Sequence, residues 1–86
     1  MIFRKDVRQI VDGKLYDTKT AKLVLEYQIH HMWVGVVRER LYRSENGWFC
    51  VINGDIIVRS DDYAKSILSK RSVDKYIEYF GEVEKG

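Results

Sequence analysis

Apolar and polar residues alternate along most of the chain up to Arg59, and three Asx-Gly pairs interrupt the alternation. Asp12-Gly13, Asn46-Gly47 and Asn53-Gly54 each separate two runs of β-forming residues. A two-residue type I′ turn needs a positive φ at both central positions, which Asn, Asp and Gly adopt at the least steric cost. The three pairs therefore predict tight β-hairpin turns.

The runs that flank these turns predict the strands of an antiparallel sheet. We expect strands at residues 9–11, 14–16, 36–44, 48–52 and 55–59. The first two strands form a small hairpin and the last three form a meander.

The segment between the small hairpin and the meander permits two interpretations. Leu23, Leu25, Tyr27 and Ile29 alternate with polar residues, which is typical of a half-buried strand. The consecutive apolar residues at 23–25 also fit a helix over residues 20–32. Residues 30–35 are either a bend or a continuation of the strand.

From Ser60 onward the apolar residues recur with the period of a helix. Ser60 is a good N-cap, and the two aspartates that follow it place negative charge where the helix dipole favours it. This helix ends at Lys70-Arg71, and Ser72 begins a second helix that stops before Gly81. The expected apolar stripes are Tyr63, Ala64, Ile67 and Leu68 in the first helix, and Val73, Tyr76, Ile77 and Phe80 in the second.

These elements predict one α+β domain over residues 1–86. An antiparallel sheet, made of hairpins and a three-stranded meander, is followed by two short C-terminal amphipathic helices packed on one face. The 86 residues are enough for a single modest core.

The hairpin turns also assign side chains to the two faces of the meander. With Asn46-Gly47 as a two-residue turn, Tyr42 lies opposite Val51, and across the next turn Trp48 lies opposite Arg59. One face then carries Arg40, Tyr42, Phe49, Val51, Ile56 and Val58. Because that face is mostly apolar, we expect the helices on it. The other face carries Leu41, Arg43, Glu45, Trp48, Cys50, Ile52, Ile57 and Arg59.

On this second face we expect Trp48 to be exposed between two arginines and beside a glutamate. Trp and Arg are the residues most enriched at binding hot spots, so Arg43, Glu45, Trp48 and Arg59 form a candidate partner-binding surface. The same residue types also suit base stacking and phosphate contact. A third interpretation is structural, with Trp48 lying on the arginine stems as an internal cation–π pair.

Composition narrows the class of protein. The chain has 15 basic and 13 acidic residues and a net charge of +2, too balanced for binding nucleic acid by charge alone. A single cysteine excludes an intrachain disulfide and suits a reducing cytoplasm. No uncharged stretch is long enough to cross a bilayer, and the first residues lack the apolar segment of a secretory signal.

The residues do not predict catalysis, a metal site or a cofactor. His30 and His31 are adjacent, so on a strand they point to opposite faces and cannot chelate one ion together. Cys50 lies in mid-strand with no neighbour expected to lower its pKa. The aspartates occupy turn or cap positions, and no glycine-rich phosphate loop is present. We therefore expect a protein that is not an enzyme.

Three blocks of sequence resemble a group of small proteins encoded by phages and mobile elements of Gram-positive bacteria. They are residues 12–21 (DGKLYDTKTA), residues 39–43 (ERLYR) ahead of residues 47–49 (GWF), and residues 72–81 (SVDKYIEYFG). Some members of that group are anti-CRISPR inhibitors. One departure is Cys50, which stands where the group has a second aromatic residue after Phe49. The group has no catalytic residues to carry over.

The resemblance implies a stoichiometric inhibitor that binds a host defence protein, such as a CRISPR effector nuclease of the Cas9 type, in the bacterial cytoplasm. The alternative from a different class is a small nucleic-acid-binding or regulatory protein that uses arginines and aromatics on a sheet. A third hypothesis is an assembly module that dimerises through a free sheet edge. None of the three involves a membrane.

Overall fold

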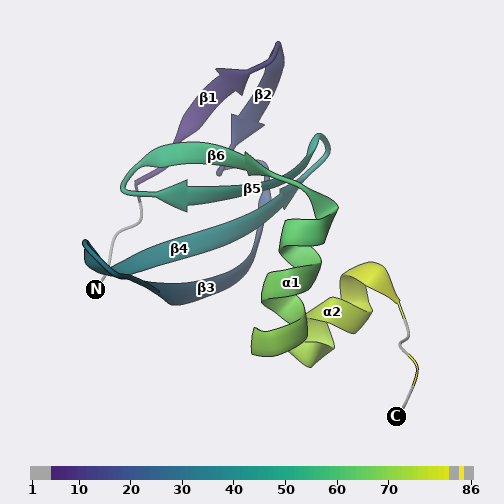
Figure 1. Ribbon diagram of the computed structural model, residues 1–86. Coiled ribbons are helices and arrows are strands. Elements are labelled where there is room, and N and C mark those ends of the chain that lie inside the picture. Colours follow the sequence, from purple (N-terminus) through teal and green to yellow (C-terminus); the bar gives the residue numbers. More distant parts are fainter. Residues whose placement is uncertain (1–4, 82–83, 85–86) are drawn as a thin grey trace.

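The computed structural model describes residues 5–81 and residue 84 (Figure 1). The elements are β1 (Arg8–Val11), β2 (Lys14–Asp17), β3 (Lys22–His31), β4 (Gly35–Ser44), β5 (Gly47–Ile52), β6 (Asp55–Arg59), α1 (Asp61–Arg71) and α2 (Val73–Phe80). β1 and β2 form a two-stranded sheet, and the next four strands form an antiparallel sheet in sequential order. The predicted α+β class, with two helices after the strands, is confirmed.

Two of the three Asx-Gly turns have the predicted geometry. Asp12 and Gly13 have φ of 51° and 78°, and Asn53 and Gly54 have φ of 50° and 84°. The third turn differs: Ser44 pairs with Gly47, so the turn lies at Glu45 and Asn46.

In this third hairpin Gly47 has a φ of 119°, but Asn46 does not have a positive φ. A turn followed by a glycine at positive φ is another common hairpin connection. Tyr42 consequently lies opposite Phe49, and the predicted partner Val51 was wrong. Because the partner shifts by two residues, each side chain keeps its predicted face.

The ambiguous segment is a strand, not a helix, and it contains a bulge. The register of β3 against β4 shifts between Leu23 and Leu25. Val24 and Tyr27 therefore enter the same core, whereas Leu23 packs against the core on the opposite face. The simple alternation expected from Leu23 to Ile29 was wrong at its first residue, because a bulge adds one residue to one strand and changes which side chains point inward.

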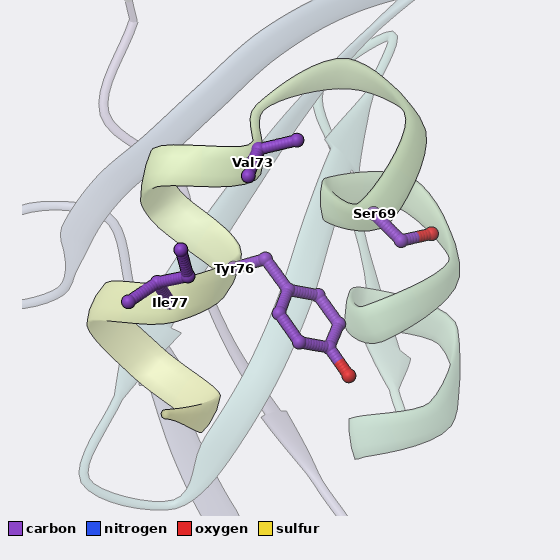
Figure 2. Close-up of a pocket in the computed structure, with 4 residues that line it drawn as sticks. All are labelled: Ser69, Val73, Tyr76 and Ile77. Atoms are coloured by element: carbon purple, nitrogen blue, oxygen red, sulfur yellow. The ribbon is translucent and has the colours of Figure 1, made fainter. Parts of the chain in front are cut away.

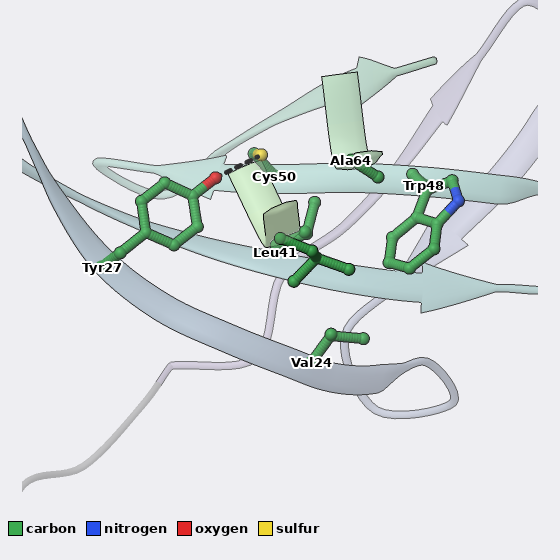
Figure 3. Packing of buried hydrophobic residues seen from close by; sticks show 7 residues of the cluster. Val24, Tyr27, Leu41, Trp48, Cys50 and Ala64 are labelled. Carbon is green, nitrogen blue, oxygen red and sulfur yellow. Dashed lines mark hydrogen bonds between the residues drawn. The ribbon is translucent and has the colours of Figure 1, made fainter. Parts of the chain in front are cut away.

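The four-stranded sheet has a separate hydrophobic core on each of its two faces. The helix-side core consists of Val24, Tyr27, Leu41, Trp48, Cys50, Ala64 and Leu68 (Figure 3). The hairpin-side core consists of Tyr16, Tyr42, Phe49, Val51 and Ile56.

The helices thus cover the face opposite to the one we expected. The membership of the faces was right, but both faces are apolar, and the first hairpin supplies Tyr16 to cover the face assigned to the helices. Its ring meets Phe49 edge-on, with centroids 5.6 Å apart. The helices then bury the other face, which carries Leu41, Trp48 and Cys50.

Both helices begin at the predicted caps. Ser60 Oγ accepts from the Tyr63 amide at 3.1 Å, and Ser72 Oγ accepts from the Lys75 amide at 3.4 Å. The Ser72 amide also donates to the Leu68 carbonyl at 2.9 Å, so Ser72 closes α1 and opens α2.

The predicted stripe of α1 is confirmed at its centre, where Ala64 and Leu68 are fully buried. The predicted stripe of α2 is only partly right. Val73 and Ile77 are exposed, and Tyr76, Tyr79 and Phe80 face the core. Ser72 is both the C-cap of α1 and the N-cap of α2, so the chain changes direction at one extended residue, and Val73 at the start of α2 lies outside the core.

Candidate functional site

Trp48, the centre of the predicted binding surface, lies in the helix-side core. Only 2% of its surface is exposed. Its ring meets Phe80 at 5.6 Å and Tyr79 at 5.2 Å between centroids, so α2 covers it. The expected exposure of Trp48 was wrong, because the helices pack on the face of the sheet that carries Trp48.

Of the three charged residues in the predicted surface, only Arg43 accompanies Trp48. The Arg43 guanidinium carbon lies 5.3 Å from the centroid of the Trp48 ring, which matches the internal cation–π interpretation. Glu45 is exposed in the β4–β5 turn. Arg59 pairs with Trp48 in the strand register, but its guanidinium lies 4.1 Å from the centroid of the Tyr63 ring. The four residues therefore do not form one continuous exposed surface around Trp48.

Arginines elsewhere on the helix side are also engaged with aromatic rings. The Arg71 guanidinium carbon lies 5.2 Å from the centroid of the Tyr27 ring. Guanidinium groups that lie on internal rings are less available for phosphate contacts, so these arginines do not form a free basic surface for nucleic acid.

A buried carboxylate organises the polar groups under the helices. Glu39 is 2% exposed, and its Oε2 accepts hydrogen bonds from the hydroxyls of Tyr27 and Tyr63, each at 2.8 Å. Arg59 Nη2 lies 3.5 Å from its Oε1. A buried charge is tolerated when it is paired and hydrogen-bonded, and Glu39 meets both conditions.

Cys50 closes this network (Figure 3). Its Sγ lies 3.6 Å from the Tyr27 hydroxyl oxygen.

The surroundings favour the protonated forms of Cys50, Tyr27 and Tyr63. Burial raises the pKa of the Cys50 thiol, although its hydrogen bond with Tyr27 acts in the opposite direction. Burial, followed by the hydrogen bond with Cys50, also raises the pKa of Tyr27. Burial and the hydrogen bond to Glu39 raise the pKa of Tyr63 to about 12. A protonated, fully buried thiol is a poor nucleophile, so the network has the properties of a structural element.

The exposed tip of the β3–β4 hairpin is the most unusual surface of the chain. Met32 is 90% exposed, Trp33 is 92% exposed and Val34 is 74% exposed. The three residues form the turn between the two longest strands, and Gly35, with a φ of 90°, starts the return strand. In Figure 1 this turn lies at the end of the hairpin remote from α2. We call Met32, Trp33 and Val34 the apolar tip.

Sequence reasoning left this segment unassigned. Three consecutive apolar residues fit a core strand as well as a turn, and periodicity does not distinguish the two. The available signal was the glycine at position 35, directly after the apolar run.

A second apolar feature lies on the helices. Ser69 of α1 and Val73, Tyr76 and Ile77 of α2 line a shallow groove, with the Tyr76 ring between the two helices (Figure 2). We call these four residues the interhelical groove.

The part of the chain at residues 5–81 and 84 contains no group of three or more His, Cys, Asp or Glu side chains placed to hold a metal ion. Within the same described residues, no helix combines the length and the apolar character that crossing a membrane requires.

Comparisons with known proteins gave no match. No family model, no curated protein and no solved structure is similar to this chain.

Proposed function

We propose that this chain is a binding protein that inhibits its target by occupancy, and that the apolar tip is its principal contact. The observation that supports this proposal is the exposure of Trp33, at 92%, between two other exposed apolar side chains. Single exposed apolar residues are common on protein surfaces, but a contiguous group that includes tryptophan is typical of an interaction site.

The energetics of the tip suit a protein pocket as the docking site. Burying a tryptophan removes roughly 150–250 Å² of surface from water, which contributes about 4–6 kcal/mol before the entropic costs of association. A tight hairpin turn reduces those costs, because its backbone is ordered before binding. The tip therefore combines a large apolar area with a small loss of conformational freedom.

The target class comes from the sequence resemblance to phage and mobile-element proteins. It implies a CRISPR effector nuclease of the Cas9 type, bound in a stoichiometric complex that blocks DNA cleavage. An inhibitor of this kind needs a contact surface and no catalytic group.

The test measures DNA cleavage by a purified, guide-loaded Cas9-type nuclease with increasing amounts of this chain. Cleavage should stop at about one chain per nuclease. Trp33→Ala should weaken inhibition by at least about 2 kcal/mol, roughly thirtyfold, without altering the fold. The matched control is Ile10→Ala in β1, which also removes an exposed apolar side chain (70% exposed) but lies outside the tip.

Two results would contradict separate parts of the proposal. If Trp33→Ala inhibited as well as the wild type, the apolar tip would not be part of the interface. If the wild-type chain did not inhibit cleavage, a Cas9-type nuclease would not be its target. In that case, proteins captured from a bacterial lysate by the wild-type chain, but not by Trp33→Ala, would identify the actual target.

The nucleic-acid alternative predicts a different response to salt. Affinity for DNA or RNA should fall steeply as salt rises, in proportion to the phosphates contacted. Binding through the apolar tip should change little over the same range.

A further inference from the structure

The outer edge of β3 is the longest unpaired strand edge in the described part of the chain. β3 spans ten residues and pairs only with β4, whereas β6, at the other edge of the sheet, spans five residues. β6 also has β1 packed near it. A long strand edge presents a row of backbone donors and acceptors that can pair with a second extended chain.

Only part of β3 is regular enough to pair again. The bulge between Leu23 and Leu25 interrupts the strand near its start, and the turn at residues 32–34 ends it. Between these limits, residues 25–31 keep a continuous register with β4. This segment contains no proline, no lysine or arginine and a single acidic residue, Glu26, so it has little of the usual protection of an edge strand. Gln28 is its midpoint.

We propose that two copies of this chain form a dimer by antiparallel pairing of residues 25–31, about a two-fold axis at Gln28. Full overlap of the regular segments requires this register. The pairing joins the two four-stranded sheets into one continuous sheet.

The side chains of the segment are compatible with a second copy in this register. On the exposed face, Gln28 meets the second copy's Gln28, and two amide side chains can donate to and accept from each other. On the same face Glu26 meets the second copy's His30, so a carboxylate faces an imidazole N–H and no like charges are opposed.

The opposite face of the segment is also suited to pairing. There Tyr27 lies opposite the second copy's Ile29; the Tyr27 ring is already buried in its own helix-side core, so this pair opposes no charges and adds little new contact. The ion pair between Lys22 Nζ and Glu78 Oε2, at 3.3 Å, lies before the bulge and therefore outside the paired segment.

The dimer goes beyond the proposed function and does not depend on it. The apolar tip follows residue 31, so each copy's tip lies past one end of the paired segment. The dimer would carry two tips on a single rigid sheet.

Sedimentation equilibrium over a range of concentrations tests the dimer directly. The wild-type chain should change from a mass of 10.2 kDa to about twice that value as its concentration rises. Gln28→Lys should weaken self-association by roughly fivefold or more, because it places two like charges directly opposite each other. The matched control is Gln9→Lys, the same substitution at an exposed position of β1, which should self-associate like the wild type.

A charge exchange makes the test specific to the two-fold axis. Gln28→Lys and Gln28→Glu should each be folded by circular dichroism and contain less dimer than the wild type at the same concentration, and a mixture of the two should recover the wild-type dimer fraction. A monomeric wild type at every concentration, a Gln28→Lys variant that dimerises like the wild type, or a mixture that stays monomeric would each overturn the proposal. A monomeric chain that still inhibits the nuclease would overturn the dimer and leave the proposed function standing.

Discussion

The two tryptophans of this chain lie in opposite environments. Trp48 is 2% exposed beneath α2, and Trp33 is 92% exposed at the end of the β3–β4 hairpin. Both tryptophans have polar residues nearby. Arg43 and Arg59 lie opposite Trp48 on the adjacent strands, and two histidines come shortly before Trp33 in the sequence.

The difference shows that charged neighbours do not keep an aromatic residue at the surface. The guanidinium of Arg43 lies over the Trp48 ring, so a charged neighbour helps to cover the indole as a cation–π partner. Trp33 has no such cover, because a tight turn at the end of a long hairpin leaves little protein around it.

The largest effect should follow from truncation of the buried tryptophan. Trp48→Ala removes the ring that contacts Tyr79 and Phe80 and leaves a cavity beneath α2. We expect a loss of about 3–5 kcal/mol in the free energy of unfolding, which is a large share of the stability of a small domain. Urea denaturation measures the loss, and Trp33→Ala is the control, expected within about 0.5 kcal/mol of the wild type. Equal losses in the free energy of unfolding for the two variants would contradict the difference in burial between Trp48 and Trp33.

A somewhat smaller effect should follow from removal of the buried carboxylate. Glu39→Ala leaves the hydroxyls of Tyr27 and Tyr63 without their acceptor and separates Arg59 from its counter-ion. We expect a loss of about 2–4 kcal/mol in the free energy of unfolding, since Arg59 keeps some access to water. Glu39→Gln retains an acceptor oxygen and should lose less. Urea unfolding that ranks the two variants in the opposite order would contradict the network.

The network should also make stability fall at high pH. The pKa of Tyr63 is raised to about 12 in the folded state, above its unfolded value near 10, and the pKa of Tyr27 is raised further. Groups of this kind stabilise the fold fully below the unfolded pKa and lose that contribution as the pH rises toward the folded pKa.

Tyrosinate absorbance measures this effect. Tyr27 and Tyr63 should remain protonated in the folded chain when the pH reaches the ordinary pKa of tyrosine. The variant Tyr63→Phe should lose one late-titrating group. Titration of all six tyrosines together, in a chain that is still folded, would show that Tyr27 and Tyr63 are accessible.

The sequence predicted what depends on local chemistry. The positive φ of Asp12 and Asn53 is a property of these residues and the glycines that follow them, and the caps at Ser60 and Ser72 follow from their position before each helix. The side chains on each face of the meander were also predicted correctly, because side-chain direction alternates along a strand.

The sequence did not predict which face the helices cover. Tyr42 and Phe49 make one face apolar, and Leu41 and Trp48 make the other apolar, so the choice depends on how the first hairpin packs. That packing is a long-range property, and so is the exposure of Trp33. The bulge in β3 likewise has no local sequence signal, and it changed the alternation expected there.

Fluorescence of two single-tryptophan variants tests the contrast most directly. Trp48→Phe leaves only Trp33, and its emission should lie at the long wavelength of a hydrated indole and be quenched readily by acrylamide. Trp33→Phe leaves only Trp48, which should emit at a shorter wavelength and resist quenching. If Trp33 were the protected tryptophan and Trp48 the accessible one, the apolar tip would lose its place as the contact surface, and the helices would have to pack on the other face of the sheet.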